Sequence, residues 1–81
     1  MEKKLINIFR QSFGLKTNKQ LDQLKKNTKI FEFESYDSFN YLKFISKIES
    51  NYNLKIDQTN ISKFNTYKSS LKFLKSKKKN K

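Results

Sequence analysis

Apolar side chains recur along this chain at spacings of three and four residues, which is typical of amphipathic helices. The first series lies near the N-terminus and consists of Leu5, Ile6, Phe9 and Phe13. It predicts a helix over about residues 2–13, which Gly14 would end. Residues 15–36 lack this regularity, so we expect a long loop there that contains a short helical turn.

The clearest pattern predicts a second helix that begins after Asp37, because aspartate is a favoured N-cap residue. Its apolar stripe consists of Phe39, Leu42, Ile45, Ile48 and Tyr52, and it is widened by Tyr41 and Phe44. We expect this helix to end near Asn51 or Asn53, where polar residues interrupt the stripe.

Two shorter apolar series follow. Ile61 and Phe64 predict a short third helix, and Thr66 is a suitable cap for a fourth. The side chains expected to form the core are Phe44, Ile45, Ile48, Ile56, Ile61, Phe64 and Leu71. The fold is therefore predicted to be all-α, a small four-helix bundle with three longer helices, a short third helix and a long first loop. We expect one folded domain over residues 1–74 and a flexible lysine-rich tail over residues 75–81.

The composition excludes several classes of function. The chain has 81 residues, enough for one small domain. It has no cysteine and no histidine, which excludes disulfides, cysteine-based metal sites and a histidine general base. A single glycine excludes a glycine-rich phosphate loop, and no apolar run approaches the length of a membrane span. We therefore expect a cytoplasmic binding or carrier module, with no catalytic centre and no metal site of its own.

The formal net charge of +12 suggests nucleic-acid binding, but the distribution of the charge argues against it. Lysines concentrate in residues 16–29 and 75–81, whereas residues 30–37 contain three acidic side chains and no basic one. The helix expected after Asp37 is nearly neutral, although a helix that reads DNA would carry basic residues itself. We interpret most lysines as a solvated surface, and a basic helical nucleic-acid-binding module remains an alternative.

A short motif opens the expected second helix. Asp37-Ser38-Phe39 is followed by NYLKFISKIESNYNLKI, which ends in an aromatic residue, a polar residue and an apolar-x-Ile sequence. This segment resembles the acyl and peptidyl carrier protein family, in which a D-S-L signature starts the second helix. The residues that match the family pattern further along are Tyr52, Asn53, Leu54, Ile56, Thr66, Leu71, Phe73 and Leu74. The resemblance covers about residues 30–75 and implies a four-helix bundle of the acyl-carrier type.

The resemblance also implies a function. Ser38 would carry a 4′-phosphopantetheine arm, attached by a separate phosphopantetheinyl transferase that uses coenzyme A. Asp37 would cap the helix and contact the transferase. The arm would hold an acyl or aminoacyl cargo as a thioester, loaded by a ligase and passed to an acyltransferase or synthase of a lipid, polyketide or peptide-type pathway. We expect a monomeric carrier rather than an enzyme.

Partner enzymes of this family bind the exposed side of the second helix, and the matching positions here are Phe39, Asn40, Lys43, Ser46, Lys47, Glu49 and Ser50. Most carriers are acidic on this helix, but this one keeps only Glu49 and carries Lys43 and Lys47. Because charge complementarity governs partner choice, we interpret this as a specialised carrier with a dedicated partner. A second alternative is an adaptor that keeps the carrier fold without the modification at Ser38.

Overall fold

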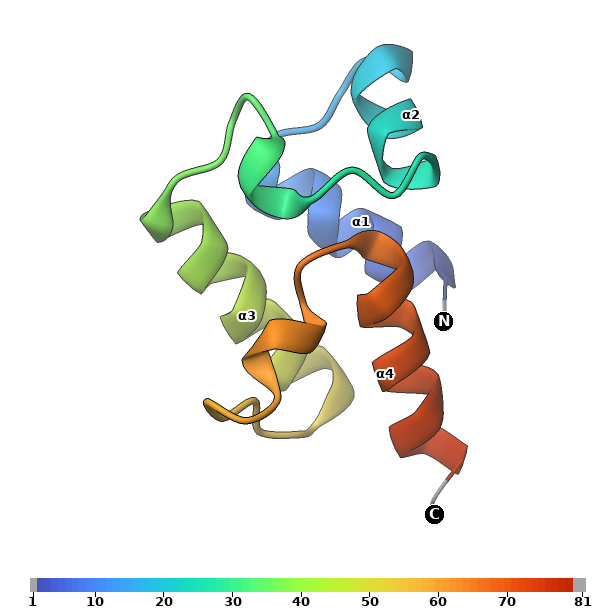
Figure 1. Cartoon of the computed structure of the whole chain (residues 1–81), viewed down its shortest axis with the longest axis vertical. Coiled ribbons are helices and arrows are strands. Elements are labelled where there is room, and N and C mark those ends of the chain that lie inside the picture. The colour runs from blue at the N-terminus through green and yellow to red at the C-terminus, as the bar shows by residue number, and fades with distance from the viewer. Residues whose placement is uncertain (1, 80–81) are drawn as a thin grey trace.

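The chain folds into four α-helices and two 3₁₀ helices, as the computed structural model of residues 2–79 shows (Figure 1). The elements are α1 (Glu2–Phe13), α2 (Asn18–Lys25), η1 (Ile30–Glu32), α3 (Ser38–Tyr52), η2 (Ile61–Lys63) and α4 (Tyr67–Lys79). No strand occurs in the described residues. The prediction of an all-α chain in the form of a small four-helix bundle is therefore confirmed.

The helices α1 and α3 are each followed directly by a residue in the left-handed backbone region. Gly14 follows α1 with a φ of 63°, and the amide of Leu15 then donates to the carbonyl of Arg10 at 3.1 Å. Asn53 follows α3 with a φ of 52°, a conformation that asparagine tolerates better than most residues. Both helix ends agree with the sequence prediction, because glycine and asparagine are the residue types that this geometry favours.

The segment expected to be a long loop contains an eight-residue helix, α2. Thr17 caps it through a reciprocal pair of bonds: its hydroxyl accepts from the amide of Gln20 at 3.1 Å, and Gln20 Oε1 accepts from the amide of Thr17 at 3.0 Å. Leu24 then buries one side of α2 against the rest of the chain. The predicted short helical turn is thus a complete capped helix.

The short third helix predicted from Ile61 and Phe64 is a single 3₁₀ turn, η2. It ends at Phe64, which leaves the helical conformation and buries its ring completely. Two residues later the hydroxyl of Thr66 accepts from the amide of Ser69 at 3.1 Å, in the first turn of the fourth helix. The fourth helix begins at the next residue and runs through Lys79. The segment expected as a tail therefore begins inside α4, Asn80 and Lys81 lie outside the described residues, and the flexibility of this segment stays a prediction.

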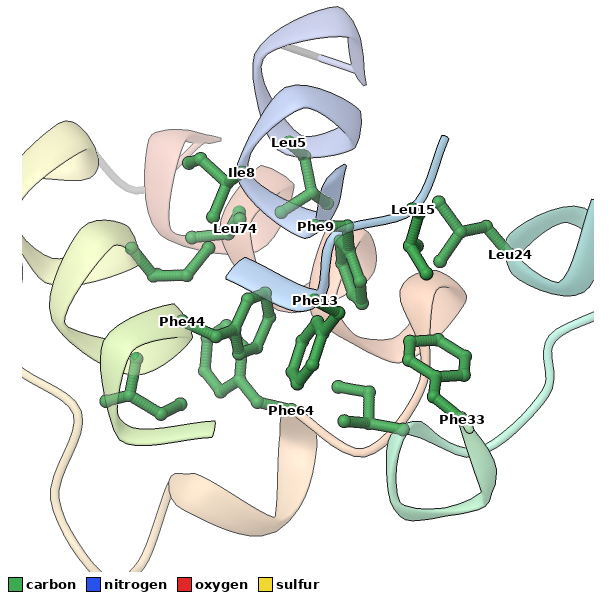
Figure 2. Packing of buried hydrophobic residues seen from close by; sticks show 13 residues of the cluster. Leu5, Ile8, Phe9, Phe13, Leu15, Leu24, Phe33, Phe44, Phe64 and Leu74 are labelled. Carbon is green, nitrogen blue, oxygen red and sulfur yellow. The ribbon is translucent and has the colours of Figure 1, made fainter. Parts of the chain in front are cut away.

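Aromatic rings fill the centre of the bundle (Figure 2). The ring of Phe44 on α3 lies 4.6 Å from that of Phe9, 5.5 Å from that of Phe13 and 6.4 Å from that of Phe64, measured between centroids. All four rings are buried. Of the predicted core residues, Phe44, Ile45, Ile48 and Phe64 are buried, and Ile56, Ile61 and Leu71 are partly buried against them.

Two members of the predicted apolar stripe of α3, Phe39 and Leu42, lie outside the core, and neither is among the residues expected to form it. Phe39 is 72% exposed and Leu42 is 65% exposed. Residues in an α-helix are spaced by about 100°, so each step of three residues falls about 60° short of a full turn. The steps from Ile45 back to Leu42 and then to Phe39 therefore rotate these side chains out of the core, which Phe44 and Ile48 occupy instead.

Within the described part of the chain, no helix combines the length and apolar composition that crossing a membrane requires.

Phe44→Ala should lower the free energy of unfolding by about 3–5 kcal/mol, because it removes the ring that three other phenylalanines contact. Leu42→Ala on the same helix serves as the control and should change it by less than about 0.5 kcal/mol. Urea unfolding followed by circular dichroism measures both values. Equal losses in the two variants would show that α3 packs by a different face.

Candidate functional site

Ser38 is the first residue of α3, and its side chain is exposed. Asp37 precedes it in an extended conformation, with a φ of −154° and a ψ of 170°. The Oδ1 atom of Asp37 accepts a hydrogen bond from the amide of Asn40 at 2.7 Å, and the carbonyl of Asp37 accepts one from the amide of Tyr41 at 3.0 Å. The prediction that Asp37 is the N-cap of this helix is confirmed.

Three polar groups remain free at this helix end. Among the described residues, the hydroxyl of Ser38 and the backbone amides of Ser38 and Phe39 have no hydrogen-bond partner. The amides lie at the positive end of the helix dipole, where anionic groups are stabilised. A phosphate attached to the Ser38 oxygen would therefore find unpaired donors beside it.

The site holds a nucleophile but no group that activates it. A serine hydroxyl reacts readily only when a base removes its proton, and no described side chain hydrogen-bonds to that of Ser38. The acidic side chains that precede α3, on Glu32, Glu34 and Asp37, are all exposed. In residues 2–79, no three carboxylates come together in an arrangement that could hold a metal ion.

Two hydrogen bonds fix the start of α3 against the rest of the fold. Asn40 Nδ2 donates to the carbonyl of Ser35 at 2.9 Å, which holds the loop that leads into the helix. The hydroxyl of Tyr41 donates to the carbonyl of Phe64 at 3.0 Å, which ties α3 to the end of η2. Two residues that closely follow Ser38 are thus bonded to other segments of the chain, although Ser38 itself lies next to a loop.

Four of the residues predicted to contact a partner line one shallow groove, namely Phe39, Lys43, Ser46 and Lys47. Gln11 of α1 and Leu42 complete the lining. Neither residue is predicted at this surface from the sequence, in which Leu42 counts only as part of the apolar stripe of the helix. A helical-wheel count that began from Phe44 would have placed Leu42 outside, but nothing in the sequence indicated that Gln11 faces α3.

The remaining partner residues differ in their surroundings. Ser50 is exposed on α3. Asn40 and Glu49 are partly buried, and each already has an intramolecular hydrogen-bond partner. Asn40 donates to the carbonyl of Ser35, and Glu49 Oε2 accepts from the backbone amide of Ile56 at 2.8 Å. Glu49 therefore holds the segment that follows α3, and the groove itself is left without a carboxylate.

Comparison with protein-family models, with curated proteins and with solved structures gave no match for this chain.

Asp37→Ala should destabilise the fold by about 0.5–2 kcal/mol, because it removes the side chain that accepts from the amide of Asn40. Asp37→Ser keeps an acceptor at the cap and should retain most of that stability. Asp22→Ala removes the same charge from an exposed position on α2 and serves as the control. Chemical denaturation of the three variants checks this, and equal losses from Asp37→Ala and Asp22→Ala would assign the effect to charge alone.

Burial, and to a lesser degree the neighbouring Tyr36, raise the pKa of Tyr41 above its ordinary value of 10.0. A phenol whose pKa is higher in the folded chain stabilises the fold below about pH 10, and this stabilisation is lost as the pH rises through the folded-state pKa. Tyr41→Phe should cost about 0.5–1.5 kcal/mol at neutral pH, since the carbonyl of Phe64 loses its donor.

The variant should also lose less stability than the parent chain between about pH 9 and about pH 11, because the ionising group is gone. Urea midpoints measured across this range provide the comparison. Parallel pH profiles for the two proteins would contradict the assignment to Tyr41.

Proposed function

We propose that this protein is an acyl or aminoacyl carrier that bears its cargo on a 4′-phosphopantetheine arm attached to Ser38. The observation that carries the proposal is the exposed and unbonded hydroxyl of Ser38 at the capped N-terminus of α3. The four-helix fold and the resemblance of residues 30–75 to carrier proteins support it. The chain itself is a delivery module for a specialised lipid, polyketide or peptide-type pathway.

The residues at the site fit the covalent attachment. The Ser38 oxygen would form a new bond to phosphorus, adenosine 3′,5′-bisphosphate would leave coenzyme A, and the hydroxyl proton would pass to a base of the transferase. The free amides of Ser38 and Phe39 would then face the phosphodiester. When attached, the arm supplies a thiol that holds the cargo as a thioester, which explains why a carrier needs neither cysteine nor histidine.

The packing of the bundle supports a cargo that stays outside the core. The rings of Phe9, Phe13, Phe44 and Phe64 occupy the space between the helices, and their centroids lie within 6.4 Å of the Phe44 centroid. Interiors packed in this way leave little room for an alkyl chain without moving side chains. The carrier would thus present its cargo to the loading ligase and to the acyltransferase or synthase without first releasing it from the fold.

A basic nucleic-acid-binding module is the second candidate, and one surface favours it. After Asp57 the chain contains no carboxylate side chain, and the exposed Lys68, Lys72 and Lys75 share one side of α4 at spacings of four and three residues. Such a stripe can neutralise a series of phosphates, and its binding would weaken steeply with salt.

Incubation with a promiscuous phosphopantetheinyl transferase and coenzyme A should add the mass of one phosphopantetheine to the purified chain. Ser38→Ala should gain no mass, whereas Ser62→Ala, which alters an exposed serine of η2 outside the groove, should be modified like the parent. Intact-protein mass spectrometry measures all three.

A parent chain that gains no mass would overturn the carrier proposal. Binding to duplex DNA or single-stranded RNA, measured by fluorescence anisotropy at two salt concentrations, then separates the alternatives. Salt-sensitive binding that Lys68→Ala/Lys72→Ala weakens would favour the nucleic-acid module. No binding would leave the unmodified adaptor.

A further inference from the structure

The large apolar side chains that remain most exposed lie close together in the sequence, around Ser38. They are Phe31, Tyr36, Phe39 and Leu42, with exposed fractions of 56%, 37%, 72% and 65%. All four fall within twelve residues of an 81-residue chain. Scattered exposed hydrophobic residues are ordinary, but exposed apolar side chains that line a common groove are typical of an interaction surface.

Two of these side chains form the apolar part of the groove between α1 and α3. Phe39 and Leu42 are three residues apart and lie on the same side of α3, and Gln11 borders them from α1. The two helices run antiparallel, because the Nζ atom of Lys4 at the start of α1 donates to the carbonyl of Asn51 at the end of α3, at 3.0 Å. The groove therefore follows α3 from Phe39 to Lys47 and begins one residue after Ser38.

The charged side chains that line the groove are all positive. Lys43 and Lys47 line it, no carboxylate does, and neither lysine forms an ion pair with a described acidic side chain. The Nζ atom of Lys43 lies 6.0 Å from the centre of the Phe39 ring, so its charge stands directly beside the apolar surface. The acidic residues occur instead in the loop that precedes Ser38.

We propose that this groove binds a partner protein through a helical segment whose apolar side chains are flanked by carboxylates. The apolar side chains would cover Phe39 and Leu42, and the carboxylates would pair with Lys43 and Lys47. This inference rests on the proposed carrier function, since it specifies the surface that a partner of the Ser38 arm presents.

Other occupants fit the observations less well. An anionic lipid surface would attract the net charge of +12, but Glu32, Glu34 and Asp37 lie next to Phe31 and Tyr36 in the sequence and would oppose insertion of that loop. A second copy of the chain would bring two molecules of net charge +12 together, and the groove offers no carboxylate to meet the lysines of the other copy. A helix with apolar side chains flanked by carboxylates matches both the apolar surface of the groove and its lysines.

The test uses two synthetic amphipathic peptides of about five helical turns, each with leucines along one face. Glutamates flank the leucines in the first peptide, and lysines replace every glutamate in the second. The glutamate peptide should bind at least about tenfold more tightly in fluorescence anisotropy. Amide shifts in NMR spectra of the labelled protein should concentrate at Gln11 and between Phe39 and Lys47.

Variants of the protein show which residues determine the preference for the glutamate peptide. Lys43→Glu/Lys47→Glu should reverse the preference between the two peptides, whereas Lys68→Glu/Lys72→Glu, with the same change of charge on α4, should keep it. Leu42→Ser should weaken binding of the glutamate peptide by about tenfold or more. Because Leu42 is exposed, this variant should fold normally, which circular dichroism verifies.

Absence of binding at about 1 mM peptide, shifts centred on α4, or an unchanged preference in Lys43→Glu/Lys47→Glu would each overturn the proposed docking surface. Ser38→Ala should bind the glutamate peptide as the parent does. A parent chain that gains no mass in the transferase assay but binds the glutamate peptide would therefore reject the carrier function alone, and a parent chain that is modified at Ser38 but does not bind the peptide would reject the docking surface alone.

Discussion

The fold depends on one contact, the packing of the Phe44 ring against aromatic rings from α1 and from the segment before α4. A domain of this size buries only about 60% of the surface that its unfolded chain exposes, so each buried side chain must contribute much. This chain contains no alanine or valine, and its core consists of leucine, isoleucine and phenylalanine. Phe44 contacts rings that precede it by about thirty residues and follow it by twenty, and it thereby joins both halves of the chain.

The same contact determines what α3 exposes. Once Phe44 and Ile48 face the core, the geometry of the helix places Phe39 and Leu42 on the outside. The cap at Asp37 sets where the helix begins, and Ser38 becomes the first exposed residue beyond it. The proposed attachment point and the apolar groove thus lie on one helix because a single buried ring fixes the rotation of that helix.

Several helix boundaries could be predicted from the sequence, because the residues that form them have a nearly obligatory local conformation. Gly14 and Asn53 mark helix ends because the left-handed region admits few other residue types, and Asp37 marks a start because its carboxylate accepts from a free amide. The sequence pattern predicts only a short helical turn where α2 forms, although Thr17 and Gln20 form a recognisable capping box. The exposure of Leu42 was missed because a spacing of three residues alone does not reveal the drift around a helix. The position of Gln11 depends on how α1 and α3 pack, which local patterns do not encode.

The long last helix gives the molecule a property that none of its contacts describes. The acidic segment before Ser38 lies at the opposite end of the molecule from the end of α4, as Figure 1 shows, and lysine is the only charged residue type in α4. The described chain extends 36 Å along its longest axis, and residues 16–29, with five lysines and one aspartate, lie with α2 at the same end as the acidic segment. Positive charge therefore lies at both ends of the molecule, and it attracts an anionic partner over a distance and raises the rate of encounter. The lysines of α4, which touch neither Ser38 nor the groove, would in this way contribute to association without forming a contact.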